Sequence, residues 1–180
     1  MVRSSEEELV RAVIAGDTTA YGVLYDHFAP LVRAVCYSHT QNLADAQDLA
    51  QDVFLRAYQK LGSLQEPSRF GKWLIGIARL RGREWRRTQM RQRARSQELG
   101  RVEFDGPDPQ NNGHVEQLRR MIAKLPEKER LALHVFYLQE RSPEDAQSIL
   151  GLSRSGFYRA LDRARKKLKR LMARELEEIL

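Results

Sequence analysis

Arginine and aromatic side chains are interleaved along residues 70–87, a combination suited to holding nucleic acid. Unpaired bases stack on aromatic faces while arginines bind the phosphate backbone. Trp73 lies on the apolar face of the helix expected here, so a core role is preferred to that of a stacking platform, whereas Trp85 fits either role. The side chains that carry the pattern are Phe70, Trp73, Arg79, Arg81, Arg83, Trp85, Arg86 and Arg87.

A second basic block, toward the C-terminus, has the pattern of a helix-turn-helix unit. A short helical segment, 143–150, precedes a tight turn, 151–153, in which Ser153 is the expected N-cap of a longer basic helix. Such a unit places the start of its second helix against base edges in the major groove. The alternative, a helical hairpin with a solvated basic face, is disfavoured by the turn chemistry and the charge together. The residues expected to face bases or nearby phosphates are Arg154, Ser155, Tyr158 and Arg159, and the positive stripe continues through Arg163, Lys166, Lys167 and Arg170.

Three aspartates, Asp45, Asp48 and Asp52, recur at spacings of three and four and therefore share one helical face. Three carboxylates on one face are compatible with a metal site, a solvated surface or a protein-docking surface. No other metal-type ligand accompanies them, so no metal site is predicted. Spacing alone leaves the other two interpretations open.

Catalytic constellations are absent from the sequence. It contains no Gly-rich phosphate loop, no HExxH-type pair and no nucleophile flanked by a plausible base. The histidines are scattered among unrelated segments, and the one cysteine, Cys36, is expected to be a buried thiol. We therefore expect no catalytic residues, no cofactor and no enzymatic activity.

The elements that position these residues are expected to be helices throughout. Ser4 or Ser5, followed three positions later by Glu7 or Glu8, predicts a capping box, and Asp17 is the expected cap of the next helix. The clearest helical period covers residues 46–61, and residues 62–68 then form a loop rich in polar residues, glycine and proline.

Charge and periodicity divide the chain into two parts. The net charge of +7 combines −4 over residues 1–66, +9 over 67–101, −4 over 102–118 and +6 over 119–180. Two separated positive blocks suggest two contacts with a polyanion.

Periodicity disappears from about residue 89 to 114. We therefore predict an all-α protein with two small helical domains, 1–90 and 115–180, joined by a flexible linker, 91–114.

No apolar run approaches the length of about twenty residues that spans a bilayer. The first eight residues are polar and acidic, unlike a signal peptide. We therefore expect no membrane insertion and a cytoplasmic protein.

Four segments in this order resemble the sigma-70 family of bacterial RNA polymerase sigma factors. Residues 45–58 resemble the core-binding helix of sigma region 2, and residues 70–78 with 84–87 resemble its promoter-melting and −10-recognition segment. Residues 125–130 are similar to the opening of region 4, and 151–153 with 163–168 to its −35-reading helix-turn-helix. The lack of a region 3 and the short length are typical of the extracytoplasmic-function (ECF) type.

The resemblance implies roles that composition does not. The partners it implies are core RNA polymerase, promoter DNA and an anti-sigma factor, and the loop 62–69 would hold a flipped-out base of the −10 element. The polymerase-binding residues would be Asp45, Asp48, Gln51 and Asp52. The −10-binding residues would be Ser68, Arg69, Phe70, Trp73, Arg79, Leu80, Arg83, Trp85, Arg86 and Arg87. The −35-binding residues would be Ser153, Arg154, Ser155, Tyr158, Arg159, Arg163 and Lys166.

Two departures from the family pattern bear on promoter choice. Leu80 stands where family members often carry an asparagine, and its side chain cannot hydrogen-bond a base. Residues 155–160 of the recognition helix also differ from the common pattern, so the −35 sequence does not follow from them. A stand-alone helix-turn-helix regulator, and a sigma-like protein that has lost promoter opening, remain the alternatives.

Overall fold

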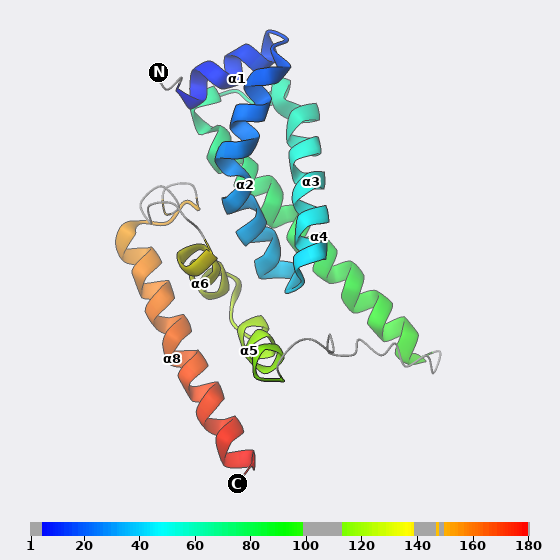
Figure 1. Cartoon of the computed structure of the whole chain (residues 1–180), viewed down its shortest axis with the longest axis vertical. Coiled ribbons are helices and arrows are strands. Elements are labelled where there is room, and N and C mark those ends of the chain that lie inside the picture. The colour runs from blue at the N-terminus through cyan, green and yellow to red at the C-terminus, as the bar shows by residue number, and fades with distance from the viewer. Residues whose placement is uncertain (1–4, 99–112, 139–146, 148–149, 180) are drawn as a thin grey trace.

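The computed structural model describes residues 5–98, 113–138, 147 and 150–179, and in these ranges it holds helices and turns and no strand. The N-terminal part comprises α1 (Glu6–Ile14), α2 (Thr18–Thr40), α3 (Leu43–Lys60), the short 3-10 turns η1 (Leu61–Ser63) and η2 (Pro67–Arg69), and α4 (Phe70–Glu98). The C-terminal part comprises α5 (Gly113–Ala123), α6 (Glu127–Leu138) and α8 (Arg154–Ile179) (Figure 1). The predicted all-α class is confirmed.

The first two helices begin at the side-chain caps that the sequence predicted. The Ser5 hydroxyl accepts a hydrogen bond from the Glu8 amide at 3.2 Å, and the Glu8 carboxylate accepts one from the Ser5 amide at 2.7 Å. Asp17 accepts from the Thr19 amide at 2.9 Å. These bonds satisfy amide groups that have no partner inside the helix. The short α1 is therefore held at its start by a complete capping box.

The N-terminal domain is built around α2, which packs against α1, α3 and α4 (Figure 1). Phe28 of α2 meets Phe70 of α4 edge to face, with ring centroids 5.5 Å apart, and both rings are buried. Cys36 is fully buried in the same core, and burial, with the nearby Asp52 charge, raises the pKa of its thiol to about 12. The prediction of a buried thiol is confirmed.

Two glycines of α4 allow it to approach α2 closely. A Cβ added at Gly71 would lie 2.7 Å from Cε1 of Phe28, and one added at Gly82 would overlap the ring of His39. Gly76, between them on the same helix, has nothing within 4 Å of its Cβ position. The contact between α2 and α4 therefore depends on the absence of a side chain at two of the three positions.

The helix α4 runs further than the loss of periodicity suggested. It continues to Glu98, so its last eight residues fall in the segment expected to be linker. These residues are mainly arginine, glutamine, alanine and glutamate, which favour a helix without an apolar stripe. Residues 99–112 lie outside the described residues. So does most of the predicted helix 143–150, of which the structure describes Gln147, in a helix, and Leu150, in a turn.

The C-terminal domain is held together by α6, which packs against α8. The buried carboxylate of Glu129 on α6 pairs with Lys167 at 2.9 Å and with Arg163 at 3.4 Å, both on α8. Arg130 is also buried, and its guanidinium donates to the backbone oxygen of Leu125 at 2.8 Å. These polar contacts fix the turn between α5 and α6 and orient α8.

The two domains lie against each other through α6 and α2, which are neighbours in Figure 1. The ring of His134 on α6 meets Tyr37 of α2 edge to face at 5.1 Å, and one of its nitrogens lies 3.2 Å from Nε2 of Gln41. Because a flexible linker was expected to separate the domains, this contact was not predicted.

Candidate nucleic-acid interface

The side chains of the predicted acidic face on α3 differ in their exposure and in their partners. Asp48 and Gln51 are exposed, and Asp45 is half-buried. Asp52 accepts hydrogen bonds from Arg56 at 3.0 Å and from Arg81 of α4 at 2.7 Å. Burial opposes its ionisation, but the hydrogen bonds and charges of the two arginines outweigh burial and lower its pKa. Asp52 therefore joins α3 to α4, while Asp48 and Gln51 remain accessible to a partner.

The loop before α4 and the first turn of that helix line an open depression of about 360 Å³ at the predicted base-holding position. Its lining includes Glu66 and Arg69, which pair with each other at 2.7 Å, and the half-buried Trp73. Ser68 is exposed in the same loop. Trp73 thus contributes both to the packing of the domain and to the cavity wall, where an aromatic face could stack with a base.

Phe70 does not fit the role implied for it. Its ring is fully buried between Phe28 and Trp73, with centroid distances of 5.5 and 6.0 Å, and it offers no surface to DNA. Its place in the motif is explained by packing, because it supports Trp73 from the core side.

The remaining α4 residues lie along the helix beyond the cavity. Leu80 is half-exposed, Arg83 and Arg87 are exposed, and Arg79, Trp85 and Arg86 are half-buried. Trp85 and Arg86 line a separate cavity of about 200 Å³ with His39 and Arg130. Twelve residues separate Trp73 from Trp85, or about 18 Å along the helix axis. The structure therefore places the two predicted aromatic residues in different cavities.

The helix-turn-helix region presents its predicted contact residues outward at the start of α8. Ser153 is the N-cap, because its hydroxyl accepts from the Gly156 amide at 3.1 Å. Phe157 and Leu161 are buried in the domain core. The first turns of α8 expose Arg154, Ser155, Tyr158 and Arg159. This arrangement leaves one face of the helix for DNA.

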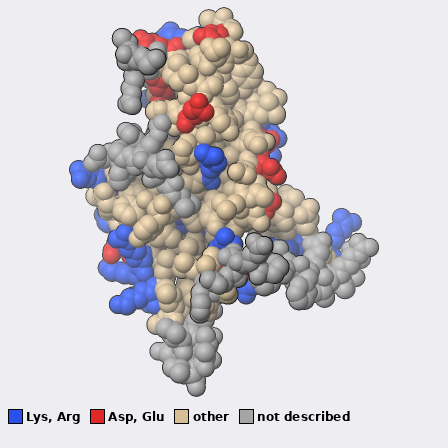
Figure 2. All heavy atoms as spheres, viewed as in Figure 1, with Lys and Arg blue, Asp and Glu red and all other residues tan. Residues whose placement is uncertain are grey.

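Further along α8 the positive stripe is partly neutralised within the domain. Arg163 pairs with Glu129, and Lys166 pairs with Asp162 at 2.9 Å. Both cations remain more than half exposed. Figure 2 shows Lys and Arg side chains gathered over this helix.

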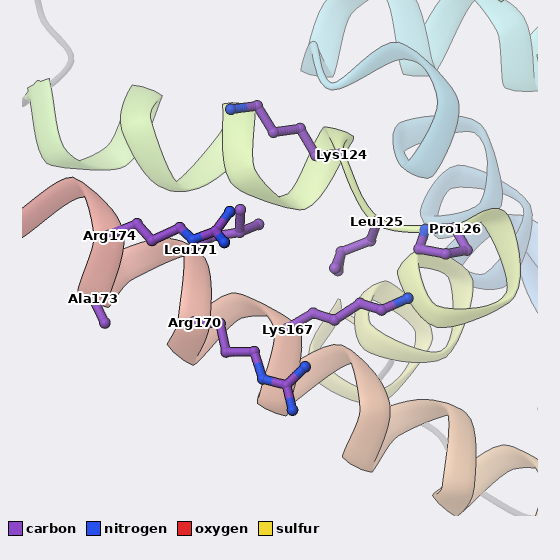
Figure 3. Close-up of a pocket in the computed structure, with 8 residues that line it drawn as sticks. All are labelled: Lys124, Leu125, Pro126, Lys167, Arg170, Leu171, Ala173 and Arg174. Atoms are coloured by element: carbon purple, nitrogen blue, oxygen red, sulfur yellow. The ribbon is translucent and has the colours of Figure 1, made fainter.

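A basic hollow of about 640 Å³ opens between α8 and the turn that joins α5 to α6 (Figure 3). In Figure 3, Lys167 extends from α8 toward Pro126, and Leu125 lines the hollow from the turn. Among the described residues, those that line it are Lys124, Leu125, Pro126, Lys167, Arg170, Leu171, Ala173 and Arg174, with no carboxylate among them, although Lys167 also pairs with Glu129. This surface is suited to a phosphate backbone.

The ion pairs that link these surfaces were not predicted, because their partners lie far apart in the sequence. Arg79 of α4 pairs with Glu127 of α6 at 2.9 Å, although 48 residues separate them. Arg81 pairs with Asp52, 29 residues away, and with Glu84. Only the spacing of four between Arg170 and Arg174 could have extended the predicted stripe.

In the part of the chain that the structure describes, no group of three or more metal-ligating side chains could hold an ion. No described helix has the length and apolar content to cross a bilayer.

A helical domain with a cavity beside Trp73, joined to a capped basic helix, is compatible with nucleic-acid binding. The family model for sigma-70 region 2 matches residues 24–92, and that for sigma-70 region 4 matches residues 115–168. The chain belongs to the sigma-70 family of RNA polymerase sigma factors, and within it to the ECF type.

Among its relatives is the RNA polymerase sigma factor YlaC of Bacillus subtilis, 30% identical over 86% of this chain and 93% of the relative. The ECF sigma factor EcfG of Rhodopseudomonas palustris is 32% identical over 79% of this chain and 80% of the relative. The probable sigma factor RfaY of Xanthomonas campestris is also 32% identical over 84% of this chain, which spans only 40% of that longer relative.

Two solved structures are similar to the whole arrangement. The structure of CnrH in complex with the cytosolic domain of CnrY has a TM-score of 0.62 at 24% identity, covers 94% of this chain and 98% of that one, and supports the fold alone. The sigma factor RpoE of Bartonella quintana, in complex with the anti-sigma factor NepR, has a TM-score of 0.52 at 25% identity and covers 85% of this chain and 96% of that one.

Proposed function

We propose that this chain binds core RNA polymerase and directs it to promoters by reading the −10 element with its N-terminal domain and the −35 element with α8. The observation that supports this function most strongly is the presence, on one chain, of the exposed residues Asp48 and Gln51, a loop cavity lined by Trp73, and a capped basic helix. The names of its relatives describe sigma factors.

The proposed contacts with the −10 and −35 elements would have different roles. A base extruded from the duplex costs a few kcal/mol, and a preformed cavity beside Trp73, with the arginines of α4 on the backbone, would offset that cost. The exposed start of α8 would read duplex DNA in the major groove. The role is one of binding and positioning, and we propose no enzymatic activity for the chain.

Because the proposed partners are polymerase and promoter DNA, we propose that the chain acts in the cytoplasm. We further propose that an anti-sigma factor controls it, since the RpoE neighbour was solved with one.

Capture of core polymerase tests the proposal. We expect purified protein to be retained stoichiometrically, and the double variant Asp48→Arg/Gln51→Arg to lose at least about tenfold in affinity, because like charges placed opposite one another at a docking face cost several kcal/mol. Asp52 is left unchanged because it joins α3 to α4. The control Asp26→Arg/Gln59→Arg changes the charge equally at two other exposed positions and should bind normally. Failure of the folded wild-type protein to bind polymerase, together with tight duplex binding, would favour the stand-alone regulator.

Substitutions on α8 should separate base reading from backbone contact. Arg159→Ala is expected to weaken binding to the preferred −35 element by about 1–3 kcal/mol and to relax its sequence preference. Lys166→Ala should weaken binding to all sequences alike and reduce its salt dependence. Selection of promoter sequences by the reconstituted holoenzyme, followed by salt titration, measures both. An unchanged sequence preference for Arg159→Ala would contradict the proposed base contact.

A further inference from the structure

The cavity of about 200 Å³ beside Trp85 lies where α2, α4, α5 and α6 meet. Three arginines are among the residues that line it: Arg86 and Arg93 of α4 and Arg130 of α6. No described residue that lines it carries a carboxylate. Positive charge therefore gathers around this cavity, which is suited to an anion.

The Arg130 guanidinium supplies a buried charge to the cavity. The residue is only 2% exposed, its Nη1 donates to the backbone oxygen of Leu125 at 2.8 Å, and its Nε has no partner among the described residues. Burial and the charge of Arg86 lower the pKa of Arg130 to about 10, so the group remains a cation at neutral pH. Glu127 lies close enough to favour that charge, but its carboxylate pairs with two arginines of α4. An anion in the cavity would supply the pairing that buried cations normally have.

Two further side chains of the cavity have buried polar atoms without a partner among the described residues. His39 is 4% exposed, and both of its ring nitrogens are among these atoms. Burial, with the charge of Arg130, lowers the pKa of His39 to about 4, so its ring is neutral at pH 7 and carries one N–H donor. Gln41 donates from Nε2 to the backbone oxygens of Tyr37 at 3.1 Å and Ser38 at 3.2 Å, which leaves its Oε1 as an acceptor. The cavity therefore offers donors for an oxyanion and one acceptor for a hydroxyl group.

The size and the hydrogen-bonding groups of the cavity select its ligand. Sites for drug-sized molecules measure about 300–1,000 Å³, so a cavity of about 200 Å³ suits a small ion and not a whole nucleotide. Inorganic phosphate keeps at least one proton at neutral pH, so it accepts hydrogen bonds and also donates one, whereas sulfate has no proton to donate.

We propose that the cavity binds inorganic phosphate. Arg130, Arg86 and the N–H group of His39 hold the anionic oxygens of the ion. The hydroxyl group of the ion donates to Oε1 of Gln41. This inference is independent of the proposed function, because no contact with DNA or polymerase enters it.

The fluorescence of Trp85 reports directly on the cavity that this residue lines. The chain has two tryptophans, and the variant Trp73→Phe keeps Trp85 alone. At pH 7 and constant ionic strength in chloride, we expect a saturable change in its emission on addition of inorganic phosphate. In the wild-type protein, phosphate at ten times its dissociation constant should raise the thermal midpoint by about 3–6 °C. Sulfate should bind at least about tenfold more weakly, because it leaves the Gln41 acceptor without a donor.

Arg86→Gln and Arg87→Gln form a matched pair on α4. Each removes one positive charge, but Arg86 lines the cavity, whereas Arg87 is exposed and is not among the lining residues. We expect Arg86→Gln to weaken phosphate binding by at least about tenfold in isothermal titration calorimetry, because a charge-assisted contact is lost. Arg87→Gln should bind phosphate as the wild-type protein does. Circular dichroism shows whether both variants are folded.

Absence of saturable phosphate binding to the wild-type protein would overturn the site, as would equal affinities of the Arg86→Gln and Arg87→Gln variants. Equal affinities of the wild-type protein for phosphate and sulfate would overturn the assignment of phosphate, and this comparison needs no variant. A short single-stranded oligonucleotide tests the other source of phosphate groups. If it changes the emission of Trp85 and inorganic phosphate does not, the cavity contacts a nucleic-acid backbone and the proposal fails.

Discussion

Replacing Gly82 by alanine is expected to lower the free energy of unfolding by about 2–3 kcal/mol, as overpacking of a buried contact does. The added methyl group would overlap the ring of His39, which is itself buried between α2, α4 and α6. Although the ring borders the cavity of about 200 Å³ beside Trp85, a carbon 2.3 Å from its Cδ2 atom is far inside van der Waals contact, so the ring must shift or the two helices must move apart. For a domain of this size, thermal unfolding monitored by circular dichroism should show a fall of roughly 10 °C in the midpoint.

Gly76→Ala supplies the matched control on the same helix. Nothing lies within 4 Å of its Cβ position, and the residue is exposed. Alanine is favoured over glycine in a helix by up to about 1 kcal/mol, so this variant should be as stable as the wild-type protein or more stable. Equal stability of the Gly82→Ala and Gly76→Ala variants would show that α4 does not approach α2 as described.

Acidification from pH 7 to pH 5 is expected to destabilise the fold through His39 and His134. Burial, with the charge of Arg130, lowers the pKa of each to about 4. His39 also faces the charges of Glu127, Arg86 and Arg83. In the unfolded chain a histidine titrates near pH 6.5, so below that pH the unfolded state binds more protons and stability falls with pH until the folded pKa is reached. The loss at pH 5 is about 2 kcal/mol for each histidine.

Urea unfolding at pH 7, 6 and 5 measures this dependence. His39→Gln and His134→Gln should each flatten the decline over that range. The carboxylates with lowered pKa, Asp52 and Glu127, lose their contribution only at lower pH, so they do not obscure the range. A wild-type stability that is constant from pH 7 to pH 5 would contradict the buried neutral histidines.

Local chemistry was sufficient to predict the starts of α1, α2 and α8, but not the Asn42 cap of α3. The capping box at Ser5 and Glu8 and the caps at Asp17 and Ser153 each depend on residues a few positions apart, and all are present. The C-terminal end of α4 was harder to predict. Its last turns bury no apolar stripe, so helix propensity is the only local signal for them.

The site was predicted less completely because its polar partners are distant in sequence. The sequence shows three aspartates on one face, but it does not show that Asp52 forms an ion pair with Arg81. His39, Arg130 and His134 are similarly scattered along the chain and meet only when α6 packs on α2. Phe70 matched the family pattern, and only packing reveals that it faces the core.

The length of α4 determines where the chain leaves the N-terminal domain. Because its last turns remain helical to Glu98, the chain leaves the N-terminal domain in a direction fixed by helical phase. Insertion of one residue between Gln92 and Glu98 would rotate that direction by about 100°, whereas insertion of a whole turn would nearly restore it and add about 5.4 Å. Such insertions would therefore change the position and direction of the end of α4 without altering its packing against α2.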